Sequence, residues 1–221
     1  MITSYGIILT TVMDGETYYL IANRGASYEY IDMFNPRCPL DKVVTYVRLC
    51  PKYERDRLRK YIDNFDVLYY DTFDGFFEYK VMYDRYKNIK QYIIEGLSLP
   101  PISNACNLHG FPKGRKKNGE TGIEAALREF EEEIGITRNY IRILKKPTVE
   151  ERYVGSDGKT YRNVYYMCDS PYMLIPRTIR RKSIFLDRQY VISPEIQHID
   201  WATKEQAKNI LPPSTFETIR F

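Results

Sequence analysis

Residues 114–136 constrain the fold most strongly, because they predict a short helix with both ends marked. Thr121 precedes Glu124 by three residues, which is the spacing of a capping box. Gly135 lies where helices commonly end in a left-handed residue, so the helix is predicted over residues 122–134. At about 100° per residue its apolar side chains form one stripe that must face a core. The members of this stripe are Ile123, Leu127, Phe130 and Ile134.

Carboxylates occupy the opposite face of this helix. Glu129, Glu132 and Glu133 converge there, whereas Glu124 and Glu131 point toward solvent. Like charges at this spacing weaken a helix, so the cluster needs an explanation. One interpretation is a solvated acidic face. The other is a site for a hard divalent cation, which takes oxygen ligands and offsets the repulsion.

The rest of the chain is predicted to form a hairpin, a helical segment, further strands and a closing helix. Two β-rich runs in residues 4–24 flank Asp14-Gly15, a strong signal for a hairpin. Between residues 39 and 96, apolar residues recur at three- and four-residue spacings, which predicts two or three helices. Strand-like runs follow the acidic helix, and a short closing helix is predicted after Thr203.

This order indicates the α+β class. We interpret residues 1–37 and 99–221 as the two parts of one sandwich domain, and residues 38–98 as an inserted small helical domain that is a candidate for RNA binding. Two independent domains are the alternative, which we favour less because a lone hairpin is not stable without further strands.

Composition narrows the classes of function only slightly. The formal net charge of +4, from 33 Lys and Arg against 29 Asp and Glu, does not by itself indicate nucleic-acid binding. The four cysteines form no CxxC pair and there are two histidines, so neither a zinc site nor a disulfide framework is indicated. The first residues lack the pattern of a secretory signal, and no run reaches the roughly 18 apolar residues of a membrane span. We therefore expect a cytoplasmic protein in a reducing compartment, without membrane association.

The residues around the acidic helix complete a longer spacing. Gly114 is followed after five residues by Glu120, and after seven more by the sequence REFEEEIGI, residues 128–136. This spacing resembles the Nudix box of the Nudix hydrolases, GX5EX7REUXEEXGU with U a bulky aliphatic or aromatic residue, and every defined position matches. The resemblance implies an αβα sandwich. It also implies hydrolysis of a nucleoside diphosphate linked to another group, with roughly one to three Mg²⁺ or Mn²⁺ ions.

The resemblance also implies roles for individual residues. It assigns metal binding and formation of the general base to the helix glutamates, completion of the ligand set to a backbone carbonyl at residue 113 or 114, and orientation of the cluster to an arginine. The metal candidates are Glu120, Glu129, Glu132, Glu133, Glu195 and the Lys113 carbonyl; the catalytic candidates are Arg128, Glu129, Glu133 and Glu195. The general base can lie on the helix or on a later loop. Glu195 resembles that later glutamate, although an ordinary surface glutamate is the alternative.

The substrate must be inferred from residues outside the box. The sequence GFPKGR, residues 110–115, and the whole layout resemble the Nudix mRNA-decapping enzymes of large cytoplasmic DNA viruses, which implies a host-cytoplasmic setting. The expected function is cleavage of m7GpppN-RNA to m7GDP and 5′-monophosphate RNA. The alternative is a small-molecule hydrolase acting on diphosphoinositol polyphosphates or on mononucleoside or dinucleoside polyphosphates. An RNA-binding module without activity is less favoured because no carboxylate of the box is missing.

Capped RNA also requires an aromatic surface for the methylated guanine and a basic track for the RNA body. The cap-stacking candidates are Tyr28, Tyr30 and Phe34, although a chain with 21 tyrosines places many of them in a core. The candidates for RNA or phosphate binding are Lys52, Arg55, Arg57, Arg59, Lys60, Lys87, Lys90, Lys113, Arg115, Lys116 and Lys117. A solvated helix face is the alternative for those in the helical segment, where acidic residues are interspersed.

Overall fold

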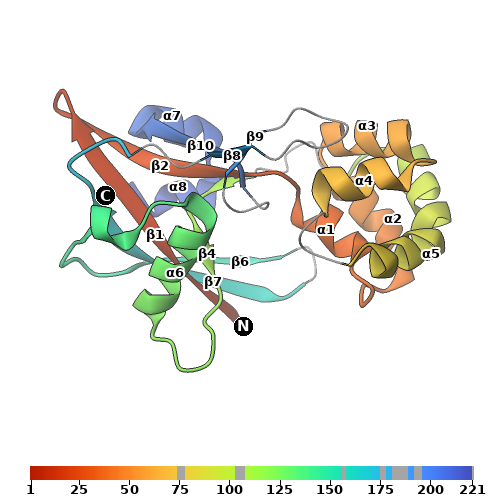
Figure 1. Cartoon of the computed structure of the whole chain (residues 1–221), viewed down its shortest axis with the longest axis horizontal. Helices are drawn as coiled ribbons and strands as arrows, with labels where there is room; N and C mark the ends of the chain where they lie inside the picture. Colours follow the sequence, from red (N-terminus) through yellow and green to blue (C-terminus); the bar gives the residue numbers. More distant parts are fainter. Residues whose placement is uncertain are drawn as a thin grey trace. The chain divides into compact units, whose positions relative to one another are not determined.

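The computed structural model describes residues 1–73, 78–102, 108–155, 158–174, 178–180, 189–191 and 196–220. The chain divides into two compact units. The sheet unit comprises Met1–Arg24, His109–Arg180 and Gln189–Phe221, and the helical unit lies within Gly25–Leu108 (Figure 1). The helical unit begins at Gly25 and not at residue 38, because helix α1 (Tyr28–Phe34) packs into the helical core.

The predicted hairpin opens the sheet unit. Strands β1 (Ile2–Met13) and β2 (Glu16–Arg24) pair antiparallel with Met13 opposite Glu16. Asp14 and Gly15 both have positive φ angles, 50° and 80°. This two-residue connection matches the twist of the two strands, as the Asp-Gly sequence predicts.

The remaining strands extend this hairpin into a mixed sheet of order β10-β2-β1-β7-β5. The strand β1 pairs in parallel with β7, from Ile2 opposite Tyr161 to Thr10 opposite Asp169. Short strands add to this path: β3 pairs with β2, β4 with β1, and β6 with β7. The bounds are β3 His109–Gly110, β4 Lys113–Gly114, β5 Arg142–Ile143, β6 Val149–Val154, β7 Thr160–Asp169 and β10 Ile196–Thr203, while β8 (Thr178–Arg180) and β9 (Gln189–Val191) form a separate pair.

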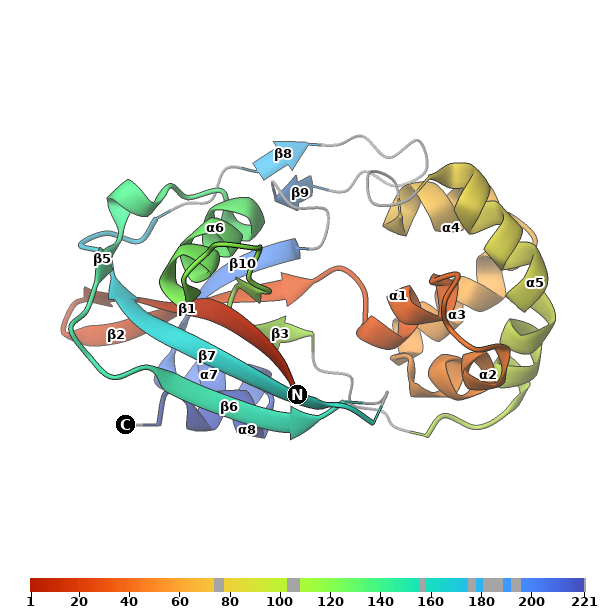
Figure 2. The same ribbon diagram turned by 90° about the horizontal axis from the view of Figure 1, so that it is seen from below.

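Helices cover both faces of the sheet (Figure 2). The helix α6 (Gly122–Ile134) packs on the face that carries Ile7 and Leu9. The helices α7 (Lys204–Ile210) and α8 (Pro213–Glu217) lie on the face that carries Ile8. Side chains alternate across a strand, so β1 contributes to two cores. The resulting three layers confirm the predicted α+β sandwich, and a short 3-10 turn (Arg138–Tyr140) follows α6.

The helical unit has its own core. After α1 come α2 (Leu40–Leu49), α3 (Lys52–Tyr61), α4 (Phe65–Thr72) and α5 (Tyr79–Ser98). The prediction of two or three helices between residues 39 and 96 was too low, because Pro51 and the Asn64 cap divide one amphipathic pattern into separate helices. Helices α2 and α5 approach closely at Gly96, where a Cβ atom would lie 2.7 Å from Val47 Cβ. In the ranges described above, no helix is long and apolar enough to cross a bilayer.

Candidate active site

The acidic helix forms as its sequence predicts. Thr121 Oγ1 accepts a hydrogen bond from the Glu124 backbone N–H (3.3 Å), and the Glu124 carboxylate accepts one from the Thr121 N–H (2.7 Å). Gly135 ends the helix with a φ of 72°, the left-handed conformation. Both caps are local, so the bounds of α6 agree with the sequence-based prediction.

The acidic face of α6 lies against the strand β4 and the segment that follows it. The Lys113 N–H donates to Glu133 Oε2 (3.0 Å), and Glu133 is buried. At Gly114 a Cβ atom would lie 2.0 Å from Glu129 Cδ, so only glycine allows the carboxylate its present position. The chain before the helix therefore contacts two of the three glutamates that the sequence predicts to converge.

Arg128 lies at the centre of the acidic residues. Its guanidinium donates to both Glu120 oxygens (2.6 and 3.0 Å). It also donates to Glu129 (2.7 Å) and Glu132 (3.0 Å). These contacts give Arg128 bonds to three carboxylates with 16% of its own side chain exposed. We call Glu120, Glu129, Glu132 and Glu133 the acidic cluster.

The charge of Arg128 changes the ionisation of Glu120. Hydrogen bonds from Arg128, and then from the Lys117 N–H, lower the pKa of Glu120 to about 2. The pKa of Arg128 is raised in turn, chiefly by its hydrogen bonds to Glu120. The guanidinium thus offsets part of the repulsion that the sequence left unexplained.

The acidic cluster offers only oxygen donors, the ligand type that Mg²⁺ and Mn²⁺ prefer. Within the described residues, however, no three acidic, histidine or cysteine side chains converge closely enough to hold one ion. Glu133 accepts a hydrogen bond from the Lys113 N–H, while Arg128 donates to Glu129 and Glu132. The carboxylate oxygens of the acidic cluster are suitable ligands for a hard divalent cation. In this structure, three of these carboxylates are hydrogen-bonded to the Arg128 guanidinium.

Three cations follow β4 and border the acidic cluster. Arg115, Lys116 and Lys117, here called the basic segment, are all exposed. Lys117 pairs with Glu132 at 3.4 Å, and the Lys116 ammonium lies 5.9 Å from the centre of the Tyr5 ring. The structure thus brings these predicted phosphate-binding residues beside the acidic cluster. Glu195, the predicted later glutamate, lies outside the described residues.

The predicted basic residues of the helical unit fall into different environments. Lys52, Arg59, Lys60 and Lys87 are exposed. Lys52 and Arg59 pair with Asp56, while Lys87 pairs with Asp84 and half-buried Lys90 with Asp63. Half-buried Arg57 has its guanidinium 5.9 Å from the centre of the Tyr30 ring. Most of these cations therefore carry local acidic or aromatic partners.

Arg55 was wrongly placed among the RNA-binding candidates. It is 4% exposed and donates to the backbone carbonyls of Val47 (3.1 Å) and Leu99 (2.9 Å). The carbonyls at the end of a helix such as α5 have no partner within that helix, and a buried arginine satisfies them. Arg55 therefore holds helices together.

Two of the three cap-stacking candidates are also core residues. Tyr30 and Phe34 are 0% exposed, and their rings lie 5.9 and 4.7 Å from the ring of Phe73, centre to centre. The helical spacing of α1 turns this pair toward the helical core. A ligand cannot stack on either ring in this structure, and Tyr28 alone of the three is exposed.

Glu151 is a buried carboxylate that the sequence did not mark, and Glu54 in the helical unit is another. Glu151 on β6 is 6% exposed and accepts hydrogen bonds from Asn163 (2.8 Å), Ser214 (2.7 Å), Thr215 (2.7 Å) and the Tyr165 hydroxyl (3.2 Å). Burial is the largest influence on the pKa of Glu151 and raises it, but the hydrogen bonds together lower it. No local pattern marks this residue, because its partners lie 12 to 64 positions away.

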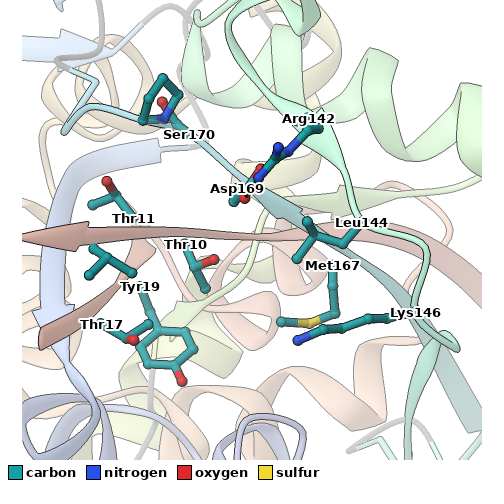
Figure 3. A pocket seen from close by; sticks show the side chains of 12 residues that line it. Thr10, Thr11, Thr17, Tyr19, Arg142, Leu144, Lys146, Met167, Asp169 and Ser170 are labelled. Carbon is teal, nitrogen blue, oxygen red and sulfur yellow. Dashed lines mark hydrogen bonds and ion pairs between the residues drawn. The ribbon is translucent and has the colours of Figure 1, made fainter. Parts of the chain in front are cut away.

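A separate cavity of about 720 Å³ lies in the sheet unit between the β1–β2 hairpin and the segment after the 3-10 turn (Figure 3). Thr10 and Tyr19 line it from the hairpin, and Lys146 from the segment. Thr10 shares the face of β1 that carries Ile8, which α7 and α8 cover. The cavity is therefore on the other side of the sheet from the acidic cluster.

Comparisons with known proteins agree with this geometry. A family model described as the NUDIX domain matches residues 100–220. The mRNA-decapping protein g5R of African swine fever virus is 34% identical over 107 residues, which cover 48% of this chain and 40% of that protein. A putative mRNA-decapping protein of Acanthamoeba polyphaga mimivirus is 33% identical over 113 residues, covering 50% and 29%. The chain thus matches less than half of the length of these relatives.

A solved structure has a similar fold. The crystal structure of a C. elegans Ap4A hydrolase binary complex covers 100% of this chain and 93% of its own, with a TM-score of 0.52 and 14% identity. At this identity the likeness concerns the fold alone.

Proposed function

This chain belongs to the Nudix family of hydrolases, and we propose that it is a metal-dependent pyrophosphatase that removes the cap from mRNA. It would cleave m7GpppN-RNA, release m7GDP and leave RNA with a 5′-monophosphate. The observation that carries this proposal is the acidic cluster on α6, held by Arg128 and Gly114 and bordered by the basic segment. The names of the viral relatives support capped RNA as the substrate.

The residues of the acidic cluster would hold the divalent ions. Carboxylates of Glu120, Glu129, Glu132 and Glu133, with the backbone carbonyl of Lys113, provide oxygen ligands for Mg²⁺ or Mn²⁺. When bound, such ions neutralise the charge of the phosphates and make water a better nucleophile. Arg128 keeps Glu120 and Glu129 in place by charge-assisted hydrogen bonds, so it acts on the reaction by orienting these two side chains.

The protein's own side chains perform two further tasks. A carboxylate, either Glu133 or Glu129 on the helix or Glu195 on the later segment, takes the proton of the attacking water. The basic segment attracts the polyphosphate, since exposed lysines and arginines raise the local concentration of an anionic substrate. We also propose that the inserted helices bind the RNA body through Lys52, Arg59, Lys60, Lys87 and Lys90, and that the protein acts in the host cytoplasm. Arg57 is left out because its guanidinium is turned toward the buried ring of Tyr30.

Hydrolysis of a small substrate is the second candidate. The basic segment would bind the phosphates of a diphosphoinositol polyphosphate or of a mononucleoside or dinucleoside polyphosphate as well as it binds a capped RNA. A small-molecule enzyme would not need the cations of the helical unit. Charge reversal at Lys52, Arg59 and Lys60 therefore separates the two: RNA cleavage falls if the first proposal holds, whereas small-substrate hydrolysis persists in either case.

The direct test uses cap-labelled RNA with purified full-length protein. With Mg²⁺ or Mn²⁺ we expect labelled m7GDP, and with a chelator no product. Glu129→Gln and Glu133→Gln should each abolish turnover, while Glu131→Gln should not, because Glu131 pairs with Arg138 away from the acidic cluster. The proposal is refuted if capped RNA stays intact both with Mg²⁺ and with Mn²⁺. Activity retained in both cluster variants would refute the site.

A further inference from the structure

We propose that a pocket in the helical unit, here called the tyrosine pocket, binds one unpaired nucleotide of RNA, with the base on the rings of Tyr79 and Tyr83 and the phosphate on Lys87 and Lys90. The inference rests on the proposed function, since it locates where the RNA body would be held. It adds a recognition mode, base stacking, that the basic residues alone do not provide.

The tyrosine pocket is a cavity of about 410 Å³ between the start of α4 and the first half of α5. Its aromatic lining comprises Phe65, Tyr79, Tyr83 and Tyr86. Phe65 is 5% exposed, and its ring centre lies 5.5, 5.5 and 4.9 Å from those of the three tyrosines. A buried ring thus supports the exposed ones from below, so the surface is preformed.

The geometry of the outer rings suits a flat ligand. Tyr79 and Tyr83 are one helical turn apart on α5, and their rings are nearly parallel, with an interplanar angle of 13° and 6.0 Å between centres. They are 37% and 40% exposed, so a ligand can reach both rings. Every nucleobase has a π-face, and stacking on a protein aromatic ring requires an unpaired base.

Cations lie over two rings of the pocket, exposed Tyr83 and buried Tyr86. The Lys87 ammonium is 5.0 Å from the centre of the Tyr83 ring, and the Lys90 ammonium is 5.9 Å from that of Tyr86. Their present partners, Asp84 and Asp63, are 54% and 85% exposed. Exposed ion pairs contribute little, so a phosphate can replace these carboxylates at low cost.

The carboxylates of the tyrosine pocket distinguish a nucleotide from a bare phosphate. Asp66 accepts a hydrogen bond from the Tyr79 hydroxyl (2.5 Å), and Asp63 lines the same pocket. Two carboxylates would repel a ligand that is only an anion. They suit a base, whose amino groups donate hydrogen bonds, combined with a phosphate that meets the lysines.

The test measures binding of a fluorescent single-stranded RNA to the full chain by anisotropy. Tyr83→Ala should weaken this affinity by roughly 5- to 150-fold, the range for losing one stacked base. Tyr83→Phe should retain it, because the ring remains. Tyr140→Ala is the matched control, an exposed tyrosine of the sheet unit.

Further measurements distinguish a variant that is misfolded from one that has lost only the base-stacking contact. Lys87→Gln combined with Lys90→Gln should weaken binding and lower the slope of log Kd against log salt by about 1 to 2. Duplex RNA should be bound equally by wild type and Tyr83→Ala. Affinity of Tyr83→Ala within twofold of wild type, or an equal loss for duplex RNA, would overturn the inference.

Catalysis separates this inference from the function on which it rests. If the wild type cleaves capped RNA, Tyr83→Ala should raise KM for capped RNA with kcat unchanged, and should leave hydrolysis of the free cap analogue unchanged. An unchanged KM would contradict RNA binding at the tyrosine pocket and would leave the decapping proposal intact. A wild type that binds RNA through Tyr83 but cleaves no cap refutes the decapping proposal and leaves the pocket in place.

Discussion

The backbone of Gly114 lies so close to the Glu129 carboxylate that a Cβ atom would stand 2.0 Å from Glu129 Cδ. The contact joins the first position of the box to its acidic helix, 15 residues later, counting from 114 to 129. A glycine is needed here for space and not for a positive φ angle, since Gly114 has an ordinary backbone conformation.

Replacing Gly114 by alanine should therefore displace the Glu129 side chain and leave the fold intact, because the group that must move is the end of a flexible side chain. We expect kcat/KM for cap hydrolysis to fall by about 100-fold or more, the size of effect that a misplaced catalytic group produces. The melting temperature should stay close to that of wild type. Gly110→Ala is the control, since a Cβ there has no atom nearer than 3.9 Å; equal activities would contradict the prediction.

Arg128→Lys should lower activity although the charge is kept. A lysine ammonium cannot form the two parallel bonds to Glu120 and also reach Glu129, which the planar guanidinium does. The expected loss in kcat/KM is about 10- to 100-fold, with a higher concentration of Mg²⁺ for half-maximal rate. Arg138→Lys on the neighbouring turn provides the comparison, because Arg138 bonds Glu131 outside the acidic cluster.

Arg55→Ala should destabilise the chain and not weaken RNA binding selectively. The variant removes the donor from the buried Val47 carbonyl and from the Leu99 carbonyl, and it removes a buried side chain, so the free energy of unfolding should fall by about 2–4 kcal/mol. Exposed Lys60→Ala should change it by less than about 0.5 kcal/mol. Urea denaturation gives both values. If the Arg55→Ala variant is as stable as wild type but no longer binds RNA, the prediction is wrong and Arg55 contacts RNA.

Glu151→Gln should lower stability in a pH-dependent manner. The pKa of Glu151 is lower in the folded protein than in the unfolded chain, where a glutamate has a pKa of about 4.3. Its ionised carboxylate therefore stabilises the fold above that pH. This stabilisation is lost as the pH falls through the folded-state pKa. At pH 7 we expect the variant to lose about 1–3 kcal/mol, since one oxygen acceptor becomes an amide donor.

The difference between the Glu151→Gln variant and wild type should shrink as the pH falls below about 4. Chemical denaturation at a series of pH values measures it. Glu150→Gln, on the same strand but paired with exposed Arg152 and half-buried Arg162, is the control and should cost less at neutral pH. A constant difference between pH 7 and pH 3 would show that ionisation of Glu151 is not the cause.

Several elements could be predicted from the sequence because their stabilising contacts are local. The capping box at Thr121, the left-handed Gly135 and the hairpin turn at Asp14-Gly15 each involve residues within a few positions of one another. The short closing helix is of the same kind, since Thr203 accepts from the Gln206 N–H (3.2 Å). The geometry of such a motif depends only on neighbouring residues, so it can be predicted without knowing the tertiary structure.

The sequence by itself determined the acidic helix, its two ends and the spacing that places glutamates opposite an apolar stripe. Only the tertiary structure decided which partners these groups meet. Arg55 and Arg59 lie one turn apart on the same helix, yet Arg55 is buried against distant carbonyls and Arg59 is exposed. Tyr30 enters a core while Tyr83 faces solvent. Helical periodicity determines the side of the helix on which each residue lies. Whether that side is buried depends on which distant segment packs against it. This packing is driven by the removal of apolar surface from water over the whole chain.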